Sequence, residues 1–222
     1  MAVNFKLQYL TKINHTTHLI TKYNMENRKV KIEVADPTTL GLFGLAMVTL
    51  VASSQKMGLT EGLSFVIPWA LFLGGVAQII AALYDFKHNN LFGATAFSAY
   101  GLFWVAVCMA WLTKLGVLGE TLQSTIDPKQ LGFAFIGYFL LSVVLTISTL
   151  KMSKVMFVLM CLICLLFVAL AADSFGLGEF WHEIAAYDEL AISLLTFYAL
   201  AAKYLNDYFG KKIVPVGKAF ID

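Results

Sequence analysis

The stretch that decides the fold class is Val155-Met-Phe-Val-Leu-Met-Cys-Leu-Ile-Cys-Leu-Leu-Phe-Val-Ala-Leu-Ala-Ala172, which contains no charged residue. At about 1.5 Å per residue, a helix of this length nearly crosses the roughly 30 Å hydrocarbon core of a membrane. The whole chain has the same character, because 59% of its 222 residues are hydrophobic and 14% are charged. Soluble domains have about 45 to 50% apolar and about 25% charged residues. The sequence therefore predicts a polytopic membrane protein.

Further apolar runs, separated by polar breaks, are also long enough to cross a membrane. Together they predict six transmembrane helices at residues 38–54, 61–84, 92–115, 130–150, 154–172 and 188–209. Because a helix in lipid must satisfy its own backbone hydrogen bonds, we expect an all-α fold. We expect three parts, namely a polar, basic tail at 1–34, the six-helix transmembrane domain at 35–218 and a C-terminal tail at 219–222.

The basic residues indicate how the helices are oriented. Six spans place both termini on one side, and Lys and Arg are enriched in short cytoplasmic loops. The side that carries the termini holds 13 of the 16 basic residues, which are Lys6, Lys12, Lys22, Arg28, Lys29, Lys31, Lys87, Lys151, Lys154, Lys203, Lys211, Lys212 and Lys218. The other side has Lys56, Lys114 and Lys129. We therefore predict cytoplasmic termini and a location in the inner or plasma membrane.

The sequence does not favour an enzyme or a metalloprotein. It contains no Gly-x-Ser-x-Gly elbow, no Walker loop and no cluster with metal-ligand spacing. Cys108, Cys161 and Cys164 lie in apolar runs, where a thiol behaves as a small hydrophobic group. We expect no catalytic residue, no metal, no cofactor and no nucleic-acid partner.

Several motifs resemble those of a known family. Gly74-Gly-Val-Ala-Gln78 precedes Asn89-Asn-Leu-Phe-Gly-Ala-Thr-Ala-Phe-Ser-Ala-Tyr-Gly-Leu-Phe-Trp104. Asp36-Pro-Thr-Thr-Leu-Gly-Leu42 opens the first helix, and Tyr204-Leu-Asn-Asp-Tyr-Phe-Gly210 with Val214-Pro-Val-Gly217 follows the last apolar run. Over residues 35–218 the chain resembles the acetate uptake transporter family, the YaaH-type succinate and acetate permeases.

This resemblance implies a six-helix transporter protomer within a ring-shaped homo-hexamer, with a separate path through each protomer. The substrates would be acetate and other small monocarboxylates, sometimes succinate, moved by symport with a proton. Membrane lipid, the proton and further copies of the chain are the partners that it implies.

The resemblance also assigns residues to the path. The family's narrow apolar constriction falls on Leu45, Tyr100 and Ile163. A carboxylate crosses hydrocarbon only where dipoles replace its water, so polar groups are expected beside the constriction. These substrate-path residues are Asp36, Thr49, Gln78, Asn90, Thr95 and Ser98. Asp85 is the candidate for proton coupling.

Plainer interpretations of the same residues stay open. Thr49, Thr95 and Ser98 can bond carbonyls of their own helices, and Gln78 can tie two helices together. Asp85, at a helix end, can be a solvated interfacial charge. Two other functions also stay open, namely a passive channel for a neutral solute or the protonated acid, and a non-conducting membrane sensor.

Five positions depart from the family's pattern. Leu45 replaces an aromatic residue and Ile163 replaces a leucine, which changes the shape of the constriction and hence the acid that it prefers. Asp36 replaces an asparagine, Thr39 replaces a proline, and Lys203 stands where many members have an acid. These three changes bear on anion binding at the entrance and on the route of the proton.

Overall fold

The computed structural model describes residues 12–17 and 34–221 and divides the chain into two units, Met1–Ala35 and Asp36–Asp222. In the first unit, residues 12–17 form a short helix whose side chains are exposed. The rest of the predicted tail, apart from Val34, lies outside the described residues, as does Asp222 at the C-terminus.

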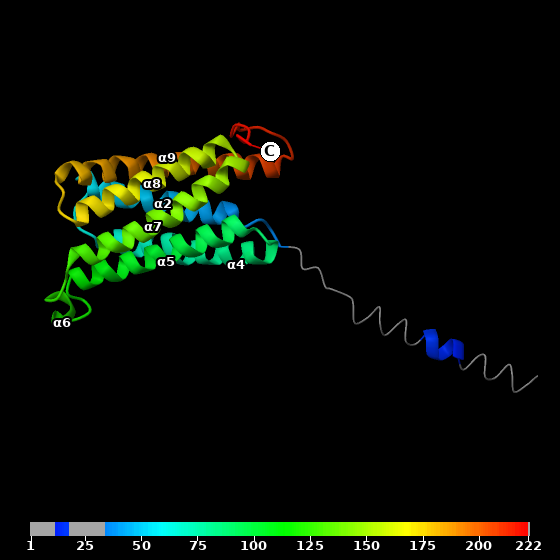
Figure 1. Ribbon diagram of the computed structural model, residues 1–222, viewed down its shortest axis with the longest axis horizontal. Coiled ribbons are helices and arrows are strands. Elements are labelled where there is room, and N and C mark those ends of the chain that lie inside the picture. Colours follow the sequence, from blue (N-terminus) through cyan, green and yellow to red (C-terminus); the bar gives the residue numbers. More distant parts are fainter. Residues whose placement is uncertain (1–11, 18–33, 222) are drawn as a thin grey trace, which may run out of the picture. The chain divides into compact units, whose positions relative to one another are not determined.

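Throughout its described residues, the second unit is built from helices and connecting turns, without strands. Its elements are α2 (Thr38–Lys56), α3 (Val66–Trp69), η1 (Ala70–Ala77), α4 (Gln78–His88), α5 (Leu91–Lys114), α6 (Glu120–Gln123), α7 (Pro128–Ser148), η2 (Thr149–Lys151), α8 (Lys154–Ser174) and α9 (Glu179–Tyr208) (Figure 1). Six helical segments of this unit are long and apolar enough to cross a membrane. The predicted all-α fold with six spans is confirmed.

Two spans begin well away from the residues at which the predicted apolar runs start, and the other four begin at or within two residues of them. The second starts at Val66 instead of Glu61, because residues 57–65 form turns in which Gly58 and Gly62 have φ angles of 71° and 73°. The sixth starts at Glu179 instead of Asp188. Here Gly178, with a φ of 115°, ends the loop, and the helix continues through polar residues that hydropathy alone assigns to the loop.

The second span changes its pitch along its length. The α-helical α3 passes into the eight-residue π-helix η1, which passes into α4. The wider turns contain Gly74 and Gly75, and a Cβ at Gly74 would lie 2.7 Å from the ring of Trp104. These glycines let the second span approach α5 closely. Gln78, the first residue of α4, follows the π-helix directly, and such irregular turns often occur at functional sites.

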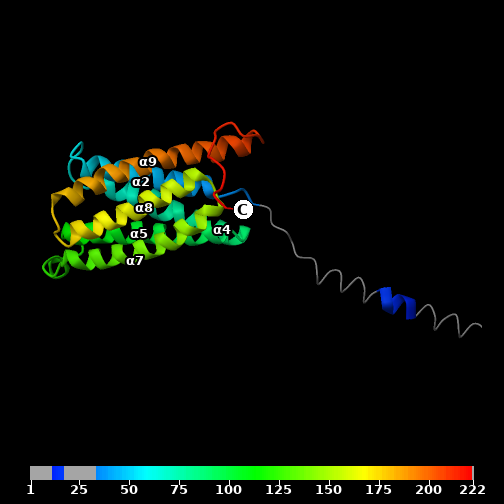
Figure 2. The ribbon, with the colours of Figure 1, turned by 45° about the horizontal axis from the view of Figure 1, so that its top comes forward.

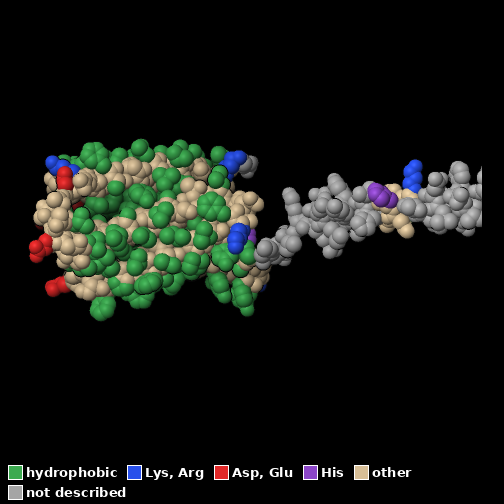
Figure 3. Space-filling view, turned by 90° about the horizontal axis from the view of Figure 1, so that it is seen from below, with side chains coloured by type: hydrophobic (Ala, Val, Ile, Leu, Met, Phe, Trp, Pro, Cys, Tyr) green, Lys and Arg blue, Asp and Glu red, His purple; other side chains and the backbone are tan. Residues whose placement is uncertain are grey.

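The six spans form a closed ring of neighbours. α2 packs against α9 and the second span, α9 against α8, α8 against α7, and α5 against the second span and α7 (Figure 2). In one face of the bundle, hydrophobic side chains cover the middle and charged side chains lie at the two ends (Figure 3). This distribution matches a lipid-facing surface between two aqueous layers.

Candidate transport path

A cavity of about 370 Å³ opens in the half of the bundle where the second unit begins and ends. It is lined by residues of α2, α4, α5, α8 and α9 and by Val216 of the C-terminal segment. Its walls are mostly apolar, with Gln78 and Asn90 among the few polar groups in the interior. We call this space the main cavity, and the end of the bundle at which it opens the terminal end.

A second, much smaller cavity of about 20 Å³ lies deeper between the same helices. Thr49 and Ile192 are among its lining residues, and we call it the inner cavity. Leu45, Tyr100 and Ile163 line both cavities. The structure therefore brings these three predicted constriction residues together where the two cavities meet, and we call this ring the aperture. The inner cavity has room for about one water molecule, so a solute passes only if side chains move.

Tyr100 is held in the aperture by a hydrogen-bond relay. Ser142 of α7 donates its hydroxyl proton to the Tyr138 carbonyl at 2.7 Å, and the Tyr100 and Ser142 hydroxyl oxygens lie 2.8 Å apart. Because Ser142 has one hydroxyl proton, Tyr100 acts as the donor to Ser142. The Tyr100 ring also stacks on Phe167 at 6.2 Å between centroids. The α7 helix, all of whose residues are described, lines neither cavity but orients this ring.

Gln78 is the most isolated polar group of the path. Its side chain is fully buried, and neither of its amide atoms has a hydrogen-bond partner among the described residues. The residue lines the main cavity. An unpaired buried amide costs free energy, so its position beside a cavity suits a group that bonds to a passing solute or to water. The alternative that Gln78 ties two helices together has no supporting contact in the described residues.

Asn90 and Asp85 form a polar corner beside the main cavity. The Asn90 side chain accepts the backbone N–H of Gly93 at 3.2 Å, which caps α5, and donates to Asp85 at 2.9 Å. Asp85 is only 1% exposed, and its second carboxylate oxygen lacks a hydrogen-bond partner within the described part of the chain. The interpretation of Asp85 as a solvated charge is therefore wrong, because Asn90 and the closely packed Gly93 cover it.

The three hydroxyl residues predicted for the path have different positions. Thr49 lines the inner cavity, and its hydroxyl donates to the carbonyl of Leu45 at 2.7 Å in its own helix. Thr95 and Ser98, which are both described and only partly buried, line neither cavity. The structure thus brings Thr49 to the path and leaves Thr95 and Ser98 outside these two cavities.

Two of the departures from the family's pattern meet at the mouth of the main cavity. The ammonium of Lys203 lies 2.7 Å from Asp36 and 2.8 Å from Asp207, one turn further along α9. All three residues line the cavity, and their side chains are between 33% and 55% exposed. We call them the terminal ion cluster. An acid just before α2 thus faces a base on α9, so the changes at positions 36 and 203 complement each other.

The state of Asp36 follows from these contacts. Partial burial by itself raises the pKa of its carboxyl group, but hydrogen bonds from Lys203 and Thr38 outweigh burial and lower the pKa from 3.8 to about 2. The backbone N–H of Thr38 is 2.9 Å from Asp36, at the start of α2. Asp36 is therefore ionised throughout the physiological pH range.

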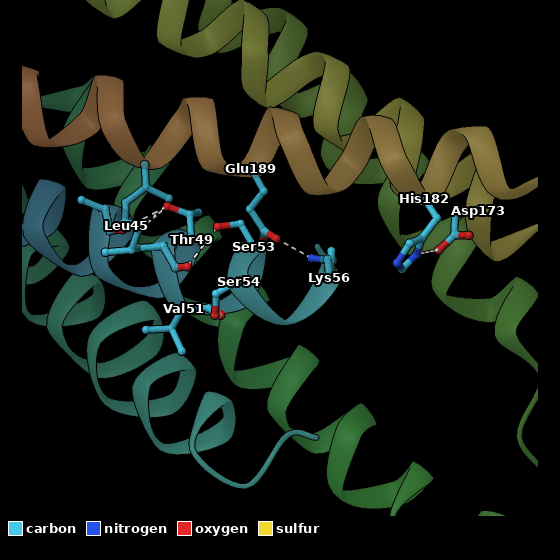
Figure 4. Close-up of polar contacts among 11 residues, drawn as sticks. Leu45, Thr49, Val51, Ser53, Ser54, Lys56, Asp173, His182 and Glu189 are labelled. Atoms are coloured by element: carbon cyan, nitrogen blue, oxygen red, sulfur yellow. Dashed lines mark hydrogen bonds and ion pairs between the residues drawn. The ribbon is translucent and has the colours of Figure 1, made fainter. Parts of the chain in front are cut away.

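A second ion pair lies at the other end of the same two helices. Lys56, the last residue of α2, donates to Glu189 of α9 at 2.6 Å (Figure 4). The Glu189 side chain is 1% exposed and that of Lys56 is 16% exposed. We call these two residues the buried ion pair. At about 1.5 Å per residue, the 19 residues of α2 correspond to about 28 Å, close to the roughly 30 Å hydrocarbon thickness of a membrane.

Sequence reasoning missed four of these features, which are the Lys203 ion pairs, the buried ion pair, the Ser142 relay and the π-helix. The Lys203–Asp36 contact and the buried ion pair join residues that are far apart in the chain, so no local pattern signals them. In the parts of the chain that the structure describes, no group of three or more His, Cys, Asp or Glu residues could hold a metal ion.

Comparison with known proteins identifies the family and the fold. Residues 21–217 match the GPR1/FUN34/yaaH family. The chain belongs to this family. The succinate-acetate/proton symporter SatP of Escherichia coli K12 is 28% identical over 188 residues, covering 84% of this chain and 97% of that protein. Acetate permease A of Emericella nidulans is 31% identical over 152 residues, covering 65% of this chain and 49% of that protein.

A solved structure has the same architecture. The structure named "the bacterial acetate channel SatP" matches with a TM-score of 0.78 and 28% identity, covering 83% of this chain and 100% of that chain. The family is one of transporters and channels, so at the family level this chain is a transport protein, not an enzyme. The six apolar helices and these relatives agree on a multi-pass membrane protein.

Proposed function

We propose that this chain carries acetate and other small monocarboxylates, with succinate as a poorer substrate, across the cell membrane together with a proton. The observation that carries this proposal is the meeting of the main and inner cavities at Leu45, Tyr100 and Ile163. A bulky apolar ring of this kind hinders hydrated ions and passes small, weakly bound solutes. The relatives named for acetate support the choice of substrate.

The arrangement of polar groups supports a path that binds its substrate weakly. Gln78 and Asn90 offer neutral amide groups to a carboxylate on the terminal side of the aperture. On the other side, the Thr49 hydroxyl, whose proton goes to the Leu45 carbonyl, offers a hydrogen-bond acceptor to acetic acid. Neutral donors replace part of the water shell of the anion without trapping it. Thr95 and Ser98 have no assigned part in this path.

The orientation and assembly are part of the same proposal. Both termini face the cytoplasm, so the main cavity opens inward and the buried ion pair lies toward the outside. Protomers assemble as a homo-hexameric ring in the lipid bilayer, with one path in each protomer, because the helices of a single protomer line both cavities. Native mass spectrometry of the detergent-extracted protein tests the number of copies.

Uptake of radiolabelled acetate into proteoliposomes tests the function. We expect an inward proton gradient to stimulate uptake, and formate, propionate or lactate to compete better than succinate and much better than urea. Protein-free liposomes give the passive diffusion of acetic acid, which is subtracted. Failure of the protein to raise acetate uptake above this background overturns the proposal.

A passive channel is the second candidate, because the solved relative is named a channel whereas the E. coli relative is named a symporter. The two mechanisms predict different responses to the same gradient. A channel for acetate or the neutral acid equilibrates the solute without concentrating it, whereas a symporter accumulates acetate against its gradient when protons flow inward. Accumulation above equilibrium, corrected for pH trapping with protein-free liposomes, decides between them.

A further inference from the structure

The buried ion pair has no part in the path as described so far. We propose that Lys56 and Glu189 form the gate of the path at the end opposite the terminal end, and that Glu189 receives the proton that travels with the substrate. This inference rests on the proposed function, because it assigns residues to the proton-linked step. It adds a gate and a proton acceptor that lie beyond the aperture.

The pair continues the surfaces of α2 and α9 that line the cavities. On α2, Leu45 lies at the aperture, Thr49 lies one turn further in the inner cavity, and Lys56 lies about two turns beyond Thr49. On α9, Ile192 lines the inner cavity, and Glu189 lies three residues before it, on the same helix face. Figure 4 shows Leu45, Thr49 and Lys56 along α2, with Glu189 reaching toward Lys56 from α9.

The burial of the pair suits a gate that a proton can open. Glu189 is almost completely withdrawn from solvent, and Lys56, at 16% exposure, covers it. A carboxylate in this environment requires its cation, whereas a neutral carboxyl group does not. Protonation of Glu189 therefore removes the attraction that holds the end of α2 against α9. Among the described residues, the next polar contact between α2 and α9 is a neutral hydrogen bond of 2.8 Å from the Ser193 hydroxyl to the carbonyl of Ala46, which protonation of Glu189 leaves in place.

The helices packed against α9 offer Glu189 no other cation at this end. Lys56 is the only charged residue within α2 (Thr38–Lys56). The charged residues of α8 are Lys154, at the opposite end of that helix, and Asp173. Asp173 lies 3.3 Å from His182 of α9, and Figure 4 shows this contact well apart from the buried ion pair.

The neighbouring carboxylate on α9 has different surroundings. Asp188 is 6% exposed and lines a shallow pocket with Glu183, Tyr187 and Leu165 of α8. Neither Lys56 nor Glu189 lines that pocket. Asp188 is the adjacent carboxylate, close enough to interact electrostatically with Glu189, but it lines this separate pocket and has no ion pair with Lys56 among the described residues. It therefore serves as a control for the loss of a neighbouring acid.

The proposed step conserves protons and charge. A proton from the outer solution binds the Glu189 carboxylate, and the hydrogen bond between Lys56 and Glu189 breaks. The freed Lys56 ammonium, which keeps its three protons, receives the carboxylate of acetate. Glu189 then passes its proton to acetate, acetic acid moves toward the aperture as a neutral molecule, and the Glu189 carboxylate pairs with Lys56 again.

The decisive variant is Glu189→Gln, measured in proteoliposomes with and without an inward proton gradient. Glutamine keeps the shape of the side chain but neither accepts the proton nor holds Lys56 by charge. We expect uptake to continue and its stimulation by the gradient to disappear. Asp188→Asn removes the adjacent carboxylate, and its stimulation should equal that of the wild type. Wild-type stimulation in Glu189→Gln overturns the proposal.

The exchange variant Lys56→Glu/Glu189→Lys covers the case in which Glu189→Gln does not fold. It keeps one acid and one base in contact, so we expect it to fold and to retain gradient stimulation. The double variant Lys56→Met/Glu189→Gln leaves no charge at this position. It should lose stimulation and raise KM for acetate roughly tenfold, the effect of losing one charge-assisted hydrogen bond to the substrate. Full stimulation in this double variant also contradicts the proposal.

A measurement without acetate separates this inference from the proposed function. Ser53 is fully buried on α2, between Thr49 and Lys56. A Ser53→Cys variant is treated with a membrane-impermeant maleimide at a single pH, and mass spectrometry locates the label. We expect severalfold faster labelling at position 53 when Glu189→Gln is also present. If wild-type acetate uptake is absent but labelling accelerates, the gate stands and the substrate is wrong; equal labelling rates refute the gate.

Discussion

The two ends of the contact between α2 and α9 use the same chemistry in opposite surroundings. At the terminal end, the acid is Asp36, two residues before α2 begins, and the base is Lys203 of α9, with side chains 45% and 33% exposed. At the other end, α2 contributes the base Lys56 and α9 the acid Glu189, with side chains 16% and 1% exposed. The distances are similar, at 2.7 Å and 2.6 Å. Burial, not geometry, distinguishes the two contacts.

This difference in burial gives the two contacts different responses to the loss of a charge. Water screens the terminal ion cluster, so the loss of one charge leaves its partner hydrated. The buried ion pair has little water to replace a lost partner, so a change in the charge of Glu189 alters the contact between the helices. In the path and gate that we propose, the ions at one end thus shape the entrance and those at the other end control passage.

The largest expected effect is the loss of stability in Lys56→Met. Glu189 then stays buried without its cation, and such a loss typically costs about 3 to 5 kcal/mol. Thermal unfolding of the detergent-solubilised protein measures the change, with Lys203→Met as the matched variant at the terminal end. We expect Lys203→Met to cost at most about 1 kcal/mol, as for exposed pairs. Equal losses at the two ends contradict the comparison.

The double variant Lys56→Met/Glu189→Gln sharpens the same prediction. It removes both charges, so no ion is left uncompensated in the interface between α2 and α9. Replacement of a buried pair by neutral groups is often close to neutral in stability. We therefore expect the double variant to unfold closer to the wild type than Lys56→Met does, and a sum of two independent losses would refute this coupling.

A substitution between the two ends tests the aperture. Leu45→Phe adds an aromatic ring where Leu45, Tyr100 and Ile163 meet, so longer acids should lose more uptake than acetate. One methylene in an apolar pocket changes discrimination by about 1 to 3 kcal/mol, so the ratio of acetate to lactate uptake should rise roughly tenfold. Competition assays measure this ratio, and Leu45→Met, which conserves volume, is the control. Equal loss for every acid would mean that the ring does not select by size.

Gln78→Leu should separate stability from transport on the terminal side of the aperture. The unpaired amide of Gln78 is fully buried, and its removal abolishes a desolvation cost of about 1 to 3 kcal/mol. We expect the variant to unfold at a higher temperature and to take up acetate more slowly. Lower stability would instead identify Gln78 as a packing or bonding residue of the native state.

The six spans follow from local composition, because about 30 Å of hydrocarbon requires a long apolar run wherever the chain crosses it. Hydropathy nevertheless placed the start of the last span nine residues too late. The residues left out, Glu179 to Tyr187, belong to the helix, and they include His182 and Glu183, whose polarity lowers the local hydropathy. Hydropathy also gave no sign that Glu189, inside the predicted span, is buried beside a cation 133 residues away in the chain.

In the candidate site too, some features could be predicted from the sequence and others could be seen only in the structure. The resemblance to a family led to the aperture, because it assigns the constriction to Leu45, Tyr100 and Ile163, and these three residues line both cavities. It did not predict that Asp85 is covered by Asn90, nor that Thr95 and Ser98 lie outside the cavities. Whether a residue faces a cavity depends on the direction of its side chain. Successive residues of a helix point about 100° apart around its axis, so a small error in the expected orientation moves a side chain away from the cavity.

The smallest expected effect concerns pH at the terminal end. Because the pKa of Asp36 is lowered from 3.8 to about 2, its contribution to stability is complete above the ordinary value and is lost only as the pH falls toward 2. Asp36 therefore does not titrate in the range where transport is measured. In Asp36→Asn, acetate uptake between about pH 5.5 and about pH 7.5 should change by the same factor at every pH, because Asp36 carries one charge throughout this range. Glu189→Gln should instead flatten the dependence of acetate uptake on pH. A flattened dependence in Asp36→Asn would mean that the transported proton binds at the terminal end and not at Glu189.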